Sequence, residues 1–209
     1  MESKKEINNN GYDYVDLGLP SGTLWATCNV GASKPSDYGL YFQWGDTKGY
    51  TKGQVGRCDG KKNFASYWSD YKFGAYPNYS KYTTAGAILE LEDDAANANM
   101  GGSWHMPTPT QIRELINTAN TTSTWMTQDG VNGRLFTSKT DNSKSIFFPA
   151  AGYAWDGSVQ GSGDCGYVWS SMLYTGGVGG GQGLSFGSGD VDLSGGYRCV
   201  GLSVRGVIG

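Results

Sequence analysis

The sequence predicts an α+β fold, with two helices set among short antiparallel strands and long loops. Three observations predict this class: short apolar alternations broken by turn residues, only two segments with helix signals, and no regular alternation of strands with helices. A chain of 209 residues suits one medium domain with its own core. We expect a flexible polar tail over residues 1–11 and a single domain over residues 12–209.

The first strands are predicted near the N-terminus. Val15, Leu17 and Leu19 alternate on one face, and after a Pro-Ser-Gly turn the segment 23–28 resumes as a strand. Residues 31–83 show no sustained period, and we expect a long loop region whose aromatic side chains pack it onto the core. These aromatic residues are Tyr41, Phe42, Trp44, Tyr50, Phe64, Tyr67, Trp68, Tyr71 and Phe73.

Two helices follow. Asp93 or Asp94 would cap a short alanine-rich helix. The clearer helix has Thr108 as its N-cap, Pro109 at the first helical position and Gln111 three residues after the cap, which is a capping box. Its apolar stripe consists of Ile112, Leu115, Ile116 and Ala119.

From residue 122 onwards the chain is again strand-like, and glycine becomes dense. Val200, Leu202 and Val204 alternate on one side of a predicted closing strand. The chain has 34 glycines, about twice the usual share of ~7%, without the triplet period of collagen. Half of them, 17, lie after Asp156, in a stretch that also contains no Lys, Glu, Asn or Pro. A different constraint therefore acts on the C-terminal quarter.

Charge and hydropathy exclude several classes of function. The 16 Lys and Arg against 19 Asp and Glu give a net charge of -3, so a nucleic-acid partner is not expected. The opening MESKKEINNN has no apolar stretch, so no signal peptide is expected in this chain. No run approaches the ~18 apolar residues of a membrane span, and none is expected.

The sequence offers little catalytic chemistry. His105 is the single histidine and lies at a helix entrance, where a structural role is expected. The segment 161–166 matches GxGxxG by letter but lacks the preceding strand and following helix. Asp190 and Asp192 share one strand face and could hold a cation or a ligand hydroxyl, although two carboxylates do not define a calcium site. We expect no catalytic residue, no metal and no cofactor. Four cysteines without a CxxC pair are expected to be free thiols: Cys28, Cys58, Cys165 and Cys199.

Several long segments resemble, in the same order, one family of Bacteroidetes surface and phage proteins. This family carries the domain named for the major paralogous proteins of Fibrobacter succinogenes. The resembling segments are YVDLGLPSGTLWATCNVGA (14–32), YFQWGDT (41–47), DDAANANMGGSWHMPTPTQIRELI (93–116), FFPAAGY (147–153), YVWSS (167–171) and GLSVRGV (201–207). His105 and Gly206 depart from the Arg and Pro that the family usually has at these positions.

The resemblance implies a C-type lectin-like fold and, for some members, a variable protein diversified by a retroelement. In those proteins mutagenic reverse transcription alters adenines, so that AAY codons become many residues but never Lys, Glu, Gln, Met or Trp. The altered segment closes the chain and forms an exposed ligand-binding face. The C-terminal stretch without Lys and Glu agrees with this pattern, whereas Met172 and Gln182 do not.

The resemblance places the variable region at about residues 166–200 and implies a recognition module on a cell surface or phage virion. Its expected partner is a protein or glycan on another cell or surface. The implied ligand-binding residues are Leu173, Tyr174, Thr175, Val178, Gln182, Ser185, Asp190, Asp192, Leu193, Tyr197 and Cys199. The implied scaffold residues are Trp169, Phe186, Arg198 and Arg205.

Two alternatives remain open. One is a structural or adhesive surface protein of the same fold without variable function. The other is an oxidase related to the formylglycine-generating enzymes, which share this fold and need a paired-cysteine copper site, for which Cys165 and Cys199 are the only conceivable pair. The calcium-lectin signatures EPN or QPD with WND are absent, so calcium-dependent sugar binding is not implied.

Overall fold

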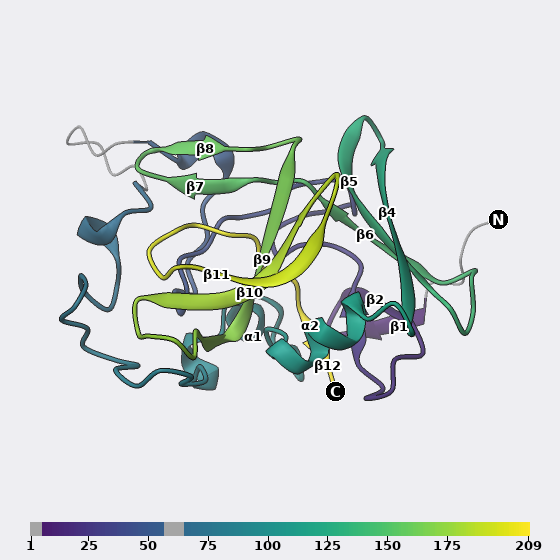
Figure 1. The fold of residues 1–209 in the computed structure, drawn as a ribbon, viewed down its shortest axis with the longest axis horizontal. Helices are drawn as coiled ribbons and strands as arrows, with labels where there is room; N and C mark the ends of the chain where they lie inside the picture. The colour runs from purple at the N-terminus through teal and green to yellow at the C-terminus, as the bar shows by residue number, and fades with distance from the viewer. Residues whose placement is uncertain (1–5, 57–64) are drawn as a thin grey trace.

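The computed structural model describes residues 6–56 and 65–209. Within these ranges, small antiparallel sheets and two short α-helices form the predicted α+β arrangement (Figure 1). Residues 1–5 of the expected tail, and Cys58 and Phe64 among the residues considered above, lie outside the described ranges.

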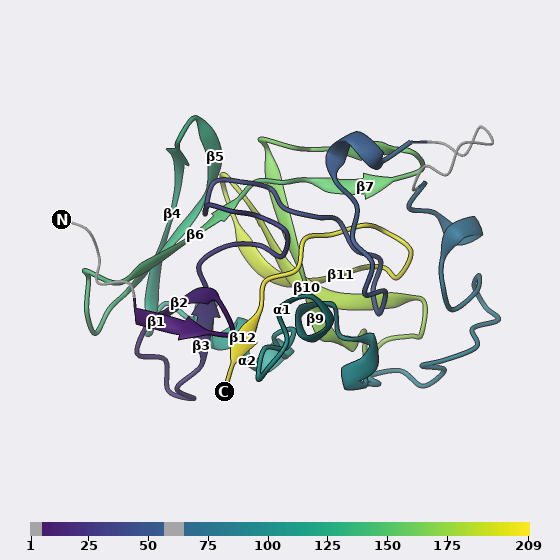
Figure 2. The same cartoon turned by 180° about the vertical axis from the view of Figure 1, so that it is seen from behind.

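The elements follow one another in an order dominated by strands. The strands are β1 (Glu6–Asn9), β2 (Tyr12–Asp16), β3 (Leu24–Ala26), β4 (Thr121–Gln128), β5 (Val131–Ser138), β6 (Ser145–Pro149), β7 (Tyr153–Trp155), β8 (Ser158–Gln160), β9 (Cys165–Leu173), β10 (Gly180–Gly187), β11 (Val191–Tyr197) and β12 (Val207–Ile208). The helices are α1 (Ala95–Met100) and α2 (Pro109–Ile116), with 3-10 turns η1 (Lys52–Gln54), η2 (Trp68–Asp70) and η3 (Leu91–Asp93). The sheets have the orders β1-β2-β3-β12, β11-β10-β9, β4-β5-β6 and β7-β8. The last strand thus completes the sheet that the first strands begin (Figure 2).

The N-terminal segment differs from the loose tail that we expected. Glu6–Asn9 form β1, which pairs antiparallel with β2. Asn10 and Gly11 connect the two strands with positive φ angles of 57° and 91°. Asn-Gly is a strong signal for a tight hairpin, because both residues tolerate this left-handed backbone. The tail prediction was therefore wrong for Glu6–Asn9.

Both helices begin where the sequence predicts. Asp94 is the N-cap of α1 and accepts a hydrogen bond from the backbone of Asn97 at 2.9 Å. The capping box of α2 between Thr108 and Gln111 is formed. However, α2 ends at Ile116 because Asn117 is already extended, so Ala119 is exposed and does not belong to the apolar stripe.

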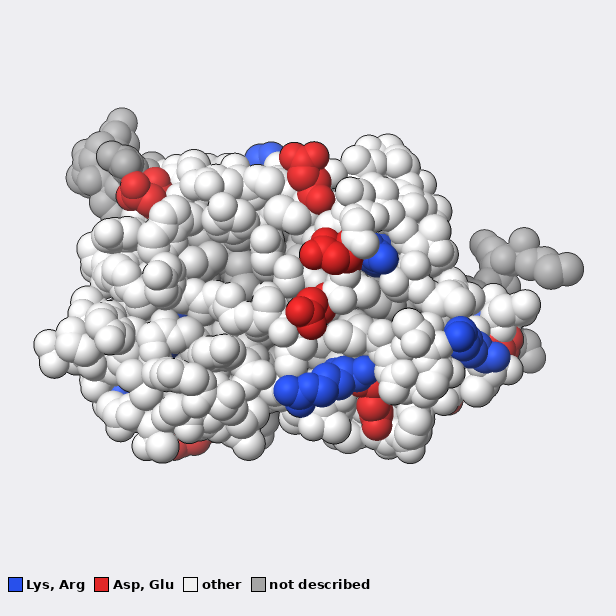
Figure 3. Space-filling model, in the orientation of Figure 1, with Lys and Arg blue, Asp and Glu red and all other residues white. Residues whose placement is uncertain are grey.

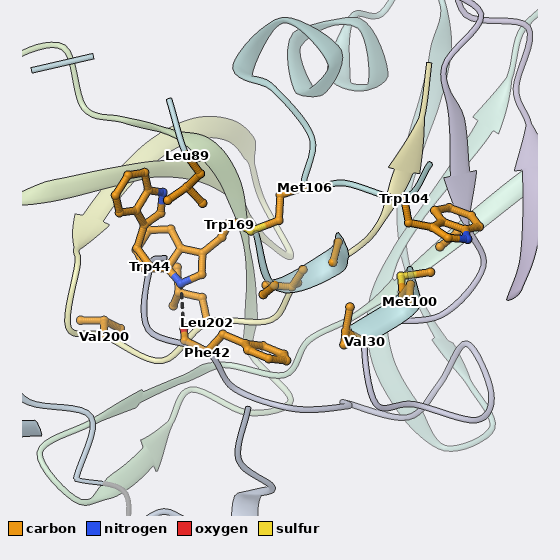
Figure 4. Packing of buried hydrophobic residues seen from close by; sticks show 14 of the residues in the cluster. Val30, Phe42, Trp44, Leu89, Met100, Trp104, Met106, Trp169, Val200 and Leu202 are labelled. Carbon is orange, nitrogen blue, oxygen red and sulfur yellow. Dashed lines mark hydrogen bonds between the residues drawn. The ribbon is translucent and has the colours of Figure 1, made fainter. Parts of the chain in front are cut away.

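The aromatic loop region packs onto the core, as predicted. The side chains of Tyr41, Phe42 and Trp44 are fully buried. Trp169 of β9 donates its indole N–H to the carbonyl oxygen of Phe42 at 2.8 Å (Figure 4). A second apolar cluster joins Ile112 of α2 to the strands. The sheet β11-β10-β9 contributes side chains to this cluster and to the one that contains Phe42 and Trp169. Both faces of the sheet therefore pack against apolar side chains.

The closing segment is not the continuous alternating strand that we predicted. Only β12 is a regular strand, and residues 198–207 are buried on both sides. Isolated bridges connect Leu202 to Phe42 and Gly201 to Ala154. Arg205 is fully buried because backbone carbonyl groups and an asparagine side chain accept its guanidinium hydrogen bonds. The segment therefore passes through the core rather than along a sheet face.

Candidate functional site

A cleft of about 940 Å³ opens beside the C-terminal strands. It lies among β7, β9, β10, β11 and the chain that follows β11. Its lining residues are Tyr153, Trp155, Tyr167, Trp169, Tyr174, Gly177, Gly179, Gly180, Gly183, Leu184, Leu193, Ser194, Gly195, Gly196, Tyr197, Val200 and Leu202. Among these described residues there is no Lys, Arg, Asp or Glu, and Figure 3 shows the hollowed face bordered by uncharged atoms. We call this hollow the aromatic cleft.

A smaller hollow of about 480 Å³ adjoins the aromatic cleft. It is lined by Tyr67, Trp68, Tyr76, Trp155, Gly179 and Tyr197. Trp155 and Tyr197 belong to both linings, and their rings stack with centroids 5.9 Å apart and planes inclined by 30°. This pair connects β7 with the end of β11 across the hollow, so two elements distant in sequence build one aromatic surface.

Backbone pairing fixes the walls of the cleft. The β7–β8 hairpin is fastened to the closing segment through the bridge between Ala154 and Gly201, and to the start of β9 through Gly152 and Gly166. Gly152 has a φ of 67°, and an added Cβ would lie 2.0 Å from the carbonyl oxygen of Gln160. Only glycine fits at this close approach, so the hairpin position depends on it.

Arg198 directly follows β11 and joins separate segments of the chain. Its side chain is fully buried, and its Nε donates to the hydroxyl of Tyr71 at 2.8 Å. The two terminal nitrogens donate to backbone oxygens, including those of Lys81 at 3.0 Å and Val178 at 3.3 Å. The guanidinium also faces the ring of Tyr79 at 4.1 Å. Arg198 therefore ties the aromatic loop region to the chain around β11.

The acidic residues near α1 lie close together, and a lysine ammonium group forms ion pairs with them. Carboxylate oxygens of Glu90, Glu92 and Asp93 lie within 4.8 Å of one another. The Nζ of Lys81 contacts all three, at 2.7, 2.8 and 2.6 Å. Hydrogen bonds to Asp93, Glu90 and Glu92 raise the pKa of Lys81. This arrangement is an ion-pair cluster.

Three residues of the implied ligand-binding set line the aromatic cleft: Tyr174, Leu193 and Tyr197. Tyr174 is 50% exposed and Tyr197 is 61% exposed. Other members of the set lie outside the lining. Thr175, Asp190 and Asp192 are exposed, and Val178 and Ser185 are partly buried.

Three further members of that set are buried, whereas the resemblance implies an exposed face. Leu173 packs in the main core cluster. Gln182 is buried because its side-chain amide donates to the carbonyl oxygen of Leu173 at 3.0 Å. Cys199 is enclosed by the aromatic loop region, and this burial raises the pKa of its thiol to about 12. Cys165 and Cys199 are both free thiols and belong to no disulfide. The four residues expected in the scaffold are also buried: Trp169, Phe186, Arg198 and Arg205.

Sequence reasoning missed most of the aromatic residues that line the two hollows. It did not single out Tyr153, Trp155 and Tyr167, and it assigned Tyr67 and Trp68 to loop packing. Both of the latter line the smaller hollow, and Tyr67 is 39% exposed. The density of aromatic residues was visible in the sequence. However, a buried and an exposed aromatic residue look alike there, because only distant contacts decide which is which.

The glycines of the C-terminal quarter are of two physical kinds. From Gly166 to Gly206 none has a positive φ, so the backbone there does not require glycine. At Gly177 an added Cβ would meet no atom within 4 Å. At Gly183 it would lie 2.5 Å from the carbonyl oxygen of Val168. Packing therefore demands glycine at Gly183 but not at Gly177.

Comparisons with known proteins identified no matching family model, no matching curated protein and no matching solved structure. Within the described ranges, no helix has the length and apolar character needed to cross a membrane. The geometry of the aromatic cleft is therefore the basis for a functional proposal.

Proposed function

We propose that this protein is a ligand-binding module with a C-type lectin-like fold, and that the aromatic cleft is its recognition surface. The observation that carries the proposal is a large concave surface with exposed aromatic rings on a buried framework. Binding sites are typically such concave, mostly apolar hollows with a few polar groups. Here the polar groups are tyrosine hydroxyls, Ser194 and the backbone of glycine-rich strands.

The exposed tyrosines are the expected anchors. Tyr174 and Tyr197 both line the cleft and keep at least half of their surface open to solvent. Tyrosine supplies a large contact area while only two side-chain torsions become ordered on binding, so it often dominates binding energy. The framework beneath is held by Trp169 and Arg198, which are fully buried. A rigid base with exposed anchors favours binding without a large ordering cost.

We further propose that this surface is one version of a retroelement-diversified face, on a Bacteroidetes cell surface or a phage virion. The sequence resemblance and the glycines support this proposal. Side chains at Gly177 and Gly189 would meet no atom within 4 Å, and those at Gly179 and Gly195 would make ordinary contacts of 3.4 Å. Such positions can change residue without unfolding the frame. A gene neighbourhood without a reverse transcriptase and a template repeat of the 3′ end would rule out diversification.

Ligand binding can be tested with labelled protein on a glycan array and against a displayed library of folded protein domains and peptides. We expect Tyr197→Ala and Tyr174→Ala each to weaken any binder by about tenfold or more, as for interface hot spots. Leu91→Ala is the matched control, because Leu91 is 62% exposed and does not line the cleft. Binders that lose affinity equally in all three variants would contradict the proposal.

A further inference from the structure

The outer edge of β11 forms part of the aromatic cleft. Among the described strands β11 pairs only with β10, so its other edge has no neighbouring strand. Residues 193–197 of β11 all line the cleft. In Figure 1 this strand lies at the border of its sheet, between β10 and the chain that leads to β12. The unpaired strand edge therefore opens onto the proposed binding surface.

Two hydrogen bonds at the ends of the β10–β11 ladder show which residues of β11 pair their backbone groups with β10. Gly187 donates its N–H to the carbonyl oxygen of Asp190 at 3.0 Å. Arg198 donates its N–H to the carbonyl oxygen of Gly179 at 3.1 Å. Antiparallel partners alternate between hydrogen-bonded and non-hydrogen-bonded pairs. Even-numbered residues of β11 therefore direct their backbone groups towards β10, and odd-numbered residues direct theirs to the free edge.

Gly195 is the residue at which this edge is most open. The carbonyl oxygen of Tyr197 already accepts the N–H of Val200 at 2.9 Å, and the N–H of Leu193 donates to Asp192 at 2.7 Å. Gly195 is an odd-numbered residue of β11, so both its N–H and its C=O point to the free edge. This residue is exposed. Neither Gly195 nor the following glycine has a side chain that shields the backbone.

The edge also lacks the usual protection against strand pairing. Natural edge strands are commonly blocked by Lys, Pro, inward-pointing charges or bulges. β11 contains neither Lys nor Pro, and its pairing with β10 shows no register shift. Asp192 is its single charged residue and lies outside the cleft lining. An uncharged lining provides no counter-charge, so a charged side chain entering the cleft would be desolvated at a cost.

We propose that the edge of β11 binds an extended, uncharged peptide segment, which adds to the sheet as a strand beside Gly195. This inference rests on the proposed function and specifies its ligand class. The N–H and C=O of Gly195 would pair with one residue of the peptide backbone, as in recognition by strand addition. Alternate apolar side chains of the peptide would then contact the aromatic rings of Trp155 and Tyr174, since successive residues of a strand face opposite sides.

The test uses the full chain and a displayed library of random linear nonapeptides. Gly195→Pro removes the N–H that points to the free edge. It removes no hydrogen bond between β11 and β10, and proline is tolerated at strand positions whose N–H faces outwards. We expect this variant to weaken selected peptides by about tenfold, the upper effect of one backbone hydrogen bond. Gly53→Ala is the control, because Gly53 lies outside the cleft lining and an added Cβ there would meet no atom within 4 Å. It should change affinity by less than about threefold.

N-methylation of the peptide gives a second readout that does not depend on how the variants fold. Strand addition predicts that methylation at alternate backbone nitrogens abolishes binding, whereas methylation at the positions between is tolerated. Failure to enrich any peptide, tolerance of methylation at every position, or unchanged affinity in folded Gly195→Pro would overturn the inference. Binding of glycans or folded domains that depends on Tyr197 but not on the N–H of Gly195 would also overturn it, while the proposed function would stand.

Discussion

The guanidinium carbon of Arg198 lies 4.1 Å from the ring centroid of Tyr79, and both side chains are buried. Three further rings lie within 6 Å of the guanidinium, those of Trp44, Tyr71 and Phe73. Its hydrogen bonds go to a tyrosine hydroxyl and to backbone oxygens rather than to any carboxylate of the described residues. Cation–π attraction and hydrogen bonding thus replace the water that the cation loses on burial.

This arrangement predicts that the guanidinium cannot be replaced by a simple ammonium. Arg198→Lys keeps the charge but cannot reach the same four acceptors, because the planar fork of donors is lost. We expect the free energy of unfolding to fall by about 2–4 kcal/mol. Urea denaturation followed by tryptophan fluorescence measures this change. Arg113→Lys is the control, since Arg113 is exposed on α2 and should change stability by no more than about 0.5 kcal/mol. Equal midpoints for both variants would contradict the prediction.

Substitution by alanine should cost much more stability at Gly183 than at Gly177, both in the C-terminal quarter. Gly183→Ala places a Cβ 2.5 Å from the carbonyl oxygen of Val168, and the backbone must move to relieve the overlap. We expect a loss of about 2 kcal/mol or more. Gly177→Ala meets no atom within 4 Å and should change stability by less than about 0.5 kcal/mol. Thermal denaturation of the two variants makes the comparison. A large loss at Gly177 would show that this glycine is structurally required.

The capping box of α2 should contribute measurably to stability. Thr108→Ala removes the acceptor for the N–H of Gln111, at 3.2 Å, and the expected loss is about 1 kcal/mol. Thr110→Ala is the matched control, because Thr110 is exposed inside the helix and alanine favours helix there. In chemical denaturation, Thr108→Ala should therefore have a lower free energy of unfolding than both the parent chain and Thr110→Ala. The reverse order would mean that packing alone fixes the start of α2.

Stability should decline in alkaline solution because buried acids hold their protons in the folded state. Burial raises the pKa of the Cys199 thiol from 9.0 to about 12, and that of the Tyr79 hydroxyl from 10.0 to about 12. The unfolded chain therefore releases these protons first. The free energy of unfolding should be unaffected by them below pH of about 9 and should fall as the pH rises towards about 12.

Denaturation midpoints measured across this range test the alkaline decline. Cys199→Ala removes one of the two groups and should flatten the pH dependence, even though it lowers stability at neutral pH by creating a small cavity. Tyr79 should ionise only when the protein unfolds, so its tyrosinate absorbance should appear over the same pH range as unfolding. An unchanged slope in Cys199→Ala would show that the buried thiol does not contribute.

Several elements could be predicted from neighbouring residues in the chain. The capping box at Thr108 and Gln111 and the cap at Asp94 were confirmed. The hairpin turn between β4 and β5 is of the same local kind, because Asp129 and Gly130 both have positive φ. These features depend on hydrogen bonds and backbone preferences within a few residues, which a local pattern records. The Asn10–Gly11 signal was equally local, but the polar composition around it led to the wrong expectation of a tail.

The aromatic cleft depends on contacts between residues far apart in the chain. Trp155 and Tyr197 stack across two elements, and the closing segment is buried on both faces because it crosses the core. Alternation along the chain could not reveal this burial. Leu173 and Cys199, which the resemblance placed on an exposed face, are fully buried. The sequence pattern was sufficient to recognise an unusual glycine-rich quarter. Whether each position in it faces solvent or the core depends on which distant segments pack against it, since burial is a property of the folded chain and not of local spacing.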